Sequence, residues 1–154
     1  CSSDDPEPHV APPSSSPPST TPASGPTVGL GPEALVRAWV KARNQALASG
    51  DLSEVRSLTA STCRSCEGIL APIEKVYDKG GHFDTDGWRV VALRLKKQSA
   101  EAATVSTGLT FAGGTTVPEA GADPVSYATE KHIVVFKLIN TSDRWRVSFV
   151  GFLS

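Results

Sequence analysis

Residues 61–81, STCRSCEGILAPIEKVYDKGG, decide how the rest of the chain is interpreted. The apolar residues in the second half of this stretch have the spacing of one helix face, and they are Ile69, Ile73, Val76 and Tyr77. Gly80 follows at the position where a left-handed residue ends a helix. Pro72 conflicts with this pattern, because its ring would meet the carbonyl of Gly68. The helix therefore either kinks at Pro72 or breaks there into two, and we favour the kink.

Cys63 and Cys66 lie near the start of the same stretch, three residues apart. On a helical turn this spacing places both side chains on one side, and it suits a disulfide, whose α carbons lie about 5.5 Å apart. A redox role would place the pair after a strand of a βαβ unit, whereas helical sequence precedes it here. A zinc site would need two further ligands, and His82 and His132 lie far apart in the sequence. The pattern favours a structural disulfide, and we expect no metal or cofactor.

Helical sequence precedes this stretch. Pro32 and Glu33 suit the first turn of a helix, because proline fits its free N-terminal end and a carboxylate is favoured there. The residues with helical apolar spacing that follow are Leu35, Trp39, Ala42 and Ala46. Gly50 is suited to end this helix, and Asp51 to cap a short second helix that runs to Leu58. Three helices are therefore predicted before residue 80.

After residue 81 the apolar pattern changes to the period of two that is typical of strands. Residues 84–87, Asp-Thr-Asp-Gly, suit a hairpin turn between a short strand at His82 and Phe83 and a strand that begins at Trp88. In the strand from Trp88 the residues expected to share one face are Val91, Leu93 and Leu95. Apolar and small residues alternate cleanly in the next strand, residues 104–111. Residues 113–124, rich in Gly and Pro, are expected to form a loop.

The C-terminal third predicts two more strands. Residues 132–139 are apolar on both faces, as in a central strand, and residues 140–143 suit a turn. The expected inward face of the last strand consists of Trp145, Val147, Phe149 and Leu153. Helices followed by antiparallel strands indicate an α+β domain, in which three N-terminal helices pack on a curved antiparallel sheet.

The N-terminal residues differ sharply in composition, because the first 27 contain 8 Pro, 7 Ser and 3 Thr. Such a segment buries too little apolar surface to offset its ordering entropy. We therefore expect a disordered Pro/Ser/Thr-rich tether over residues 1–28 and a single domain over residues 29–154. Cys1, followed by small polar residues, is typical of the mature end of a bacterial lipoprotein, in which that cysteine carries the lipid. Since no run of about 18 apolar residues occurs, the lipid is the expected membrane attachment.

Several of these features together resemble a family of actinobacterial lipoproteins of unknown function. The matching features are a helix with Trp39, the Gly50-Asp51 junction, the Cys63-x-x-Cys66 helix, Tyr77, Gly80-Gly81 and Trp88. The resemblance implies a lipidated cysteine, a tether and one small C-terminal domain, and it implies no known activity. The order of elements also resembles the nuclear-transport-factor-2-like (NTF2-like) cone, in which a curved sheet holds helices over a pocket. That fold includes both enzymes and non-enzymes.

These observations predict an extracytoplasmic lipoprotein, anchored to the outer face of the cell membrane, whose domain binds a ligand or partner without catalysis. The expected partner is an envelope protein or a small apolar ligand, and the formal net charge of −1 gives no basis for nucleic-acid binding. The residues that could line a pocket are Trp39, Tyr77, His82 and His132. One alternative is a small enzyme that uses a histidine in a cone pocket as a base. Another is an envelope thiol-disulfide protein that uses the cysteine pair.

Overall fold

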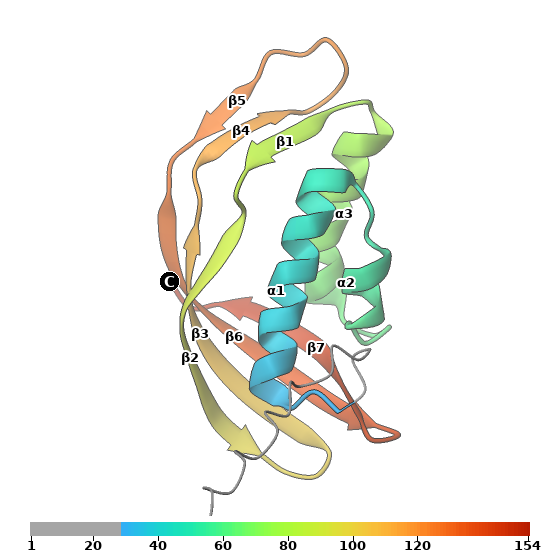
Figure 1. Cartoon of the computed structure of the whole chain (residues 1–154), viewed down its shortest axis with the longest axis vertical. Coiled ribbons are helices and arrows are strands. Elements are labelled where there is room, and N and C mark those ends of the chain that lie inside the picture. The colour runs from blue at the N-terminus through green and yellow to red at the C-terminus, as the bar shows by residue number, and fades with distance from the viewer. Residues whose placement is uncertain (1–28) are drawn as a thin grey trace, which may run out of the picture.

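The computed structural model describes residues 29–154, which form three helices and seven strands (Figure 1). The helices are α1 (Pro32–Ser49), α2 (Ser53–Ser57) and α3 (Arg64–Asp78). The strands are β1 (His82–Thr85), β2 (Trp88–Gln98), β3 (Ala102–Phe111), β4 (Gly114–Val117), β5 (Val125–Tyr127), β6 (Glu130–Thr141) and β7 (Arg144–Phe152). The predicted α+β class with helices on a curved antiparallel sheet is confirmed. The predicted tether over residues 1–28 lies outside the described residues.

Helix α1 begins and ends where the sequence indicates. Pro32 occupies its first turn, and Gly50 ends it in a left-handed conformation with φ of 80°. A Cβ atom at Gly50 would lie 2.6 Å from the ring of Tyr77, so a larger residue would collide with α3 there. The Tyr77 hydroxyl donates a hydrogen bond to the carbonyl of Leu47, which fastens the last turn of α1 to α3. The predicted cap of α2 by Asp51 is wrong, because Leu52 is the N-cap residue, and the Asp51 carboxylate accepts the Ser53 N–H in the turn before the helix.

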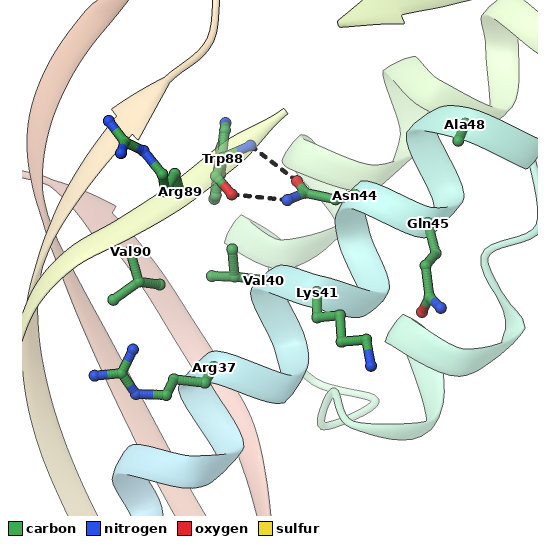
Figure 2. A pocket seen from close by; sticks show the side chains of 9 residues that line it. All are labelled: Arg37, Val40, Lys41, Asn44, Gln45, Ala48, Trp88, Arg89 and Val90. Atoms are coloured by element: carbon green, nitrogen blue, oxygen red, sulfur yellow. Dashed lines mark hydrogen bonds between the residues drawn. The ribbon is translucent and has the colours of Figure 1, made fainter. Parts of the chain in front are cut away.

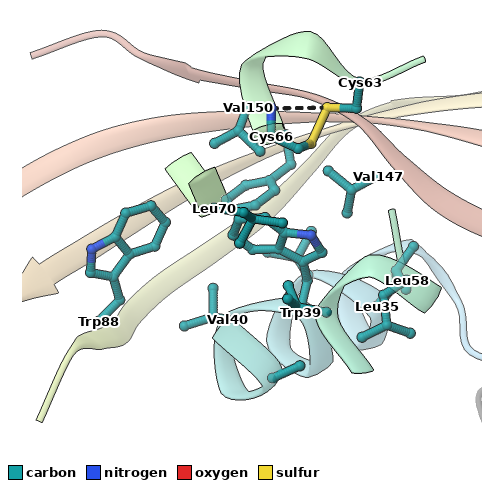
Figure 3. Close-up of a cluster of buried hydrophobic side chains, with 14 of the residues drawn as sticks. Leu35, Trp39, Val40, Leu58, Cys63, Cys66, Leu70, Trp88, Val147 and Val150 are labelled. Atoms are coloured by element: carbon teal, nitrogen blue, oxygen red, sulfur yellow. Dashed lines mark hydrogen bonds between the residues drawn. A yellow bond between two sulfur atoms is a disulfide. The ribbon is translucent and has the colours of Figure 1, made fainter. Parts of the chain in front are cut away.

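Helix α3 runs without a break through Pro72, so the alternative of two separate helices is wrong. Pro72 lies on the exposed face, where a lost backbone hydrogen bond is open to water. Cys63 caps the helix, and its sulfur accepts the Cys66 N–H. The two cysteines form the predicted disulfide, with their α carbons 5.3 Å apart. The bond closes the first turn of α3 and packs at the edge of the core (Figure 3).

The strands form two antiparallel sheets, a four-stranded one in the order β2-β3-β6-β7 and a three-stranded one in the order β1-β4-β5. Three chain segments cross from one sheet to the other: β1 into β2, β3 into β4, and β5 into β6. Figure 1 shows the two sheets as one ribbon surface that bends around α1, with β1, β4 and β5 beyond the bend. The line along which these three segments pass from one sheet to the other is here called the bend line.

The hairpin predicted at residues 84–87 is wrong, because β1 and β2 belong to different sheets. His82 pairs with Val117 in β4, whereas Trp88 pairs with Phe111 in β3. The Thr85 hydroxyl lies against the carbonyls of Ala112 and Gly113 and accepts the N–H of Gly87, which holds the chain in a crossing rather than a turn. The loop predicted over residues 113–124 is also partly wrong, since its first residues form β4.

Bulges overturn two predicted strand faces. The register of β2 against β3 shifts between Val90 and Ala92, so Val91 leaves the expected face and is 55% exposed, while Leu93 packs against the core. In the pairing of β6 with β7 the register shifts between Lys137 and Leu138, and this shift moves Phe149 to the outer face. Val150 is buried in its place, and Leu153 is exposed rather than inward. A bulge inserts one residue and reverses the alternation beyond it. The predicted central position of β6 and the turn before β7 are confirmed.

The hydrophobic core lies between the three helices and the concave face of the four-stranded sheet. Trp39 is its largest fully buried side chain. Its ring centroid lies 5.6 Å from that of Phe136 and 6.2 Å from that of Trp88. Its indole N–H donates to the Thr59 hydroxyl at 2.8 Å. Figure 3 shows Trp39 within this cluster, with Val147 from β7 beside it. The core therefore fixes α1 over the sheet and sets the position of the residues described next.

Candidate functional site

Two hollows border the C-terminal half of α1, and Trp88 contributes to both. The first, here called the cone cavity, lies between α1 and the bend line and has a volume of about 350 Å³. Four aromatic side chains line it, from β1, β2, β3 and β5: Phe83, Trp88, Phe111 and Tyr127. Arg43 and Leu47 line it from α1, and Thr85 and Thr116 from the three-stranded sheet.

Arg43 is the only charged side chain among the described residues that line the cone cavity. Its guanidinium carbon lies 3.8 Å from the centre of the Trp88 ring, so the two groups stack. Nη1 makes a long hydrogen bond of 3.4 Å to the Asn44 side-chain oxygen, while Nε is buried and has no hydrogen-bond partner in residues 29–154. Burial lowers the pKa of Arg43 to about 10, an effect that Tyr127 partly offsets. Arg43 is therefore still charged at neutral pH but poorly solvated.

Asn44 holds Trp88 in place beside this arginine. Its side-chain amide accepts the Trp88 N–H at 2.9 Å and donates to the Trp88 carbonyl at 2.7 Å, as the two dashed lines in Figure 2 show. Gly87 permits this contact, because a Cβ atom there would lie 2.4 Å from the Asn44 oxygen. The Trp88 ring also stacks on Phe111 at 4.5 Å with an interplanar angle of 3°. Arg43 thus lies over the ring of Trp88, and Asn44 fixes the backbone of Trp88 to α1.

The second hollow, here called the outer groove, lies on the other side of Trp88, between α1 and the edge strand β2 (Figure 2). Its volume is about 530 Å³, and its cationic lining residues are Arg37, Lys41 and Arg89. Figure 2 shows these three side chains pointing in different directions around the rim. Cations that do not converge make a positive surface but not a site for one anionic group. The cone cavity is therefore the better candidate site.

The four residues predicted for a pocket are not gathered around the cone cavity, and none of them lines it. Trp39 is fully buried in the core, and Tyr77 packs on Phe83 while bonded to α1. His82 is exposed in β1. His132 lies near the bend line, 4.6 Å from Phe111 between ring centroids, but both its nitrogens are engaged elsewhere.

His132 is held by two neighbours on its own side of the sheet. Its Nδ1 lies 2.6 Å from the Ser154 carbonyl oxygen and its Nε2 lies 2.9 Å from the Glu130 carboxylate. The hydrogen bond to Ser154 and then the one to Glu130 raise the pKa of His132. Because both ring nitrogens are occupied in this way, His132 is not poised to take a proton from a molecule in the cone cavity.

Sequence reasoning missed Arg43, although a signal was present. Val36, Val40 and Leu47 are buried on the inner face of α1, and Arg43 falls on the same face at helical spacing. A cation on the apolar stripe of a helix is expensive to bury, so its presence there points to a function. The aromatic lining could not be assembled from the sequence, because it required the correct strand crossings.

Two negative findings limit other kinds of site. Within residues 29–154 no helix has the length and apolar composition that a membrane span requires. The same residues contain no group of three or more His, Cys, Asp or Glu side chains that could hold a metal ion.

Three helices on a sharply bent antiparallel sheet, with a cavity on the concave side, define an NTF2-like or ketosteroid isomerase-like cone. Several solved structures share this fold. The intermembrane-space region of the chloroplast protein ARC6 aligns with a TM-score of 0.60 and 13% identity, over 79% of this chain and 93% of that one. A ketosteroid isomerase-like protein from Erwinia carotovora aligns with a TM-score of 0.50 and 16% identity, over the same shares of 79% and 93%.

An enzyme with this fold is among the similar structures. Hexachlorocyclohexane dehydrochlorinase LinA-type3 from Novosphingobium barchaimii aligns with a TM-score of 0.54 and 13% identity, over 79% of this chain and 86% of that one. No protein-family model and no curated protein matches the sequence. At these identities the likeness shows the fold alone, and the function must be argued from the cavity.

Proposed function

We propose that the domain binds a small organic ligand in the cone cavity without transforming it. The observation that carries this proposal is the lining of the cavity, in which four aromatic side chains surround a space of about 350 Å³. Binding sites for small molecules are concave, mostly apolar and supplied with a few polar groups, and this volume lies at the small end of their range. The domain therefore takes a compact ligand with an apolar body.

The polar side chains of the lining support binding rather than catalysis. They are Arg43, Thr85, Thr116 and Tyr127, and none of them is an effective general base at neutral pH. The enzyme alternative needs an imidazole or carboxylate directed at the ligand, and both ring nitrogens of His132 are already bonded to Ser154 and Glu130. The thiol-disulfide alternative needs an accessible sulfur, but Cys66 has 0% and Cys63 only 5% of its surface exposed.

The experiment titrates the full chain with small aromatic compounds and measures binding by isothermal titration calorimetry. A variant that fills the cavity, Thr116→Phe, should abolish binding. Thr115→Phe is the matched control, since the preceding strand residue points to the opposite face and does not line the cavity. Equal loss in both variants, or no loss in either, would place the binding elsewhere. Conversion of a bound compound to a product would instead favour the enzyme.

We further propose that the domain works at the outer face of the cell membrane, attached through a lipid on Cys1. The support is the sequence around Cys1, since the described residues begin at Gly29. A single acyl chain anchors weakly, so a diacylglyceryl group is the expected modification. Cys1→Ala should move the protein from the membrane fraction to the soluble fraction. Continued recovery of this variant with membranes would contradict the anchor.

A further inference from the structure

We propose that the cone cavity selects ligands with a carboxylate, which pairs with Arg43 while the apolar body of the ligand lies against the aromatic walls. This inference rests on the proposed function and specifies the chemical class of its ligand. The class is a compact aromatic or otherwise apolar monocarboxylic acid.

Arg43 has no counter-charge among the described residues. None of the ion pairs formed within residues 29–154 includes Arg43, and no Asp or Glu of this part of the chain lines the cavity. Arg43 is half-buried and its Nε is fully buried, so its charge is poorly solvated, and stacking on Trp88 only partly offsets that cost. An anion brought by the ligand would remove this cost, so the cavity favours an acid over a neutral molecule of the same shape.

The geometry of the Arg43 guanidinium also favours a carboxylate. Nη1 is engaged by Asn44 and Nε is buried, whereas Nη2 makes no hydrogen bond to any described residue. Nη2 can therefore donate a charge-assisted hydrogen bond to a carboxylate oxygen of the ligand. Trp88 holds the plane of the guanidinium, and the Asn44 amide in turn fixes the Trp88 backbone. The arginine is therefore held flat, in an orientation set before the ligand arrives.

Arg43 also lies beside an apolar space. Phe111 stacks on Trp88 and lines the cavity with it, and Phe83 and Tyr127 line the cavity from the three-stranded sheet. A ligand whose carboxylate meets Arg43 can therefore place a flat apolar ring against these walls. A small polyanion would gain the charge pairing but would desolvate its remaining charges without partners, because Arg43 is the only cation lining this cavity in residues 29–154.

The test compares two probes of nearly equal shape, 1-naphthoate and 1-naphthamide, by calorimetry on the full chain at neutral pH. We expect the acid to bind at least about tenfold more tightly than the amide, as a charge-assisted hydrogen bond would provide. Arg43→Gln should reduce the affinity for the acid to that for the amide and leave the amide unchanged. Arg37→Gln is the matched control on the same helix, because Arg37 borders the outer groove. It should change neither affinity.

Each outcome decides between the two proposals. Equal binding of acid and amide would overturn the carboxylate preference and leave ligand binding intact, whereas binding of neither probe would overturn both. A preference that survives Arg43→Gln, or that disappears in Arg37→Gln, would assign the anion to another site and refute the role of Arg43. If Arg43→Gln does not fold, the comparison of the two probes in the unchanged protein still decides the preference. Arg43→Lys keeps the charge but not the flat guanidinium. It should then show an intermediate ratio of the affinities for acid and amide.

Discussion

Replacing Trp39 by alanine tests the packing on which the whole site depends. Trp39 has no exposed surface and contacts Trp88 and Phe136 in the core. Truncation of a buried tryptophan costs about 3–5 kcal/mol, through lost burial and the cavity left behind. The lost hydrogen bond to Thr59 adds no separate penalty to this free energy of unfolding, because the Thr59 hydroxyl still donates to the Val55 carbonyl. Domains of this size are stable by about 5–15 kcal/mol, so Trp39→Ala should be severely destabilised or unfolded.

The measurement is urea denaturation followed by circular dichroism, with two reference variants. Trp39→Phe keeps most of the buried area and loses the indole N–H, so it should cost about 1–2 kcal/mol. Lys75→Ala, at an exposed position of α3, should change stability by less than about 0.5 kcal/mol. If Trp39→Ala kept its denaturation midpoint and lost ligand binding instead, Trp39 would belong to the site, and the assignment of the core would be refuted.

Three further predictions concern the disulfide at the start of α3, the contact of Asn44 with Trp88, and His132. Reducing the disulfide between Cys63 and Cys66 should cost about 2 kcal/mol, the chain-entropy value for so short a loop, and lower the melting temperature without loss of fold; an unchanged melting temperature would refute this. Asn44→Ala leaves both backbone groups of Trp88 unpaired and should cost about 1–3 kcal/mol and weaken ligand binding, whereas an Ala at its exposed neighbour Gln45 should do neither. Because hydrogen bonding raises the pKa of His132, its contribution to stability should be complete below the ordinary pKa of about 6.5. It should then disappear as pH rises through the higher folded-state value, and His132→Gln should abolish this dependence in a pH series of melting curves.

The helical half of the fold could be predicted because each helix carries its own local signals. Pro32 and Gly50 mark the ends of α1, and the apolar residues between them keep a period of 3.6. The same reasoning placed the disulfide at the start of α3 and favoured one helix, kinked at Pro72, over two separate helices. These signals act within a few residues, so no knowledge of the tertiary structure was needed.

The sheet was predicted less well because its errors arise between strands. The alternation in β3 was correct, since β3 has no bulge along its pairing with β6. Val91 and Phe149 were assigned to the wrong face because a bulge in each case shifts the alternation by one residue. Whether Asp84–Gly87 turns back or continues into a second sheet depends on the partners of Thr85, which lie 27 and 28 residues away in the sequence. No local pattern encodes that choice.

The segment at residues 84–87 that was misread as a turn also helps to form the cavity, because Thr85 and Gly87 line it. A flat continuous sheet under α1 would bring its side chains up to the helix and leave no space, as happens beneath Trp39. At the bend line the strands turn away from α1, and the gap is lined by residues on either side of the crossings, among them Phe83, Trp88, Phe111 and Tyr127. Arg43 lies on α1 beside this gap and stacks on Trp88. The misread segment at residues 84–87 and the unexpected arginine are therefore two parts of one feature. Gly87 has a positive φ and lies against Asn44 and Leu47, so Gly87→Phe should disrupt this crossing and abolish the calorimetric binding of 1-naphthoate; unchanged binding would show that the site does not depend on the crossing.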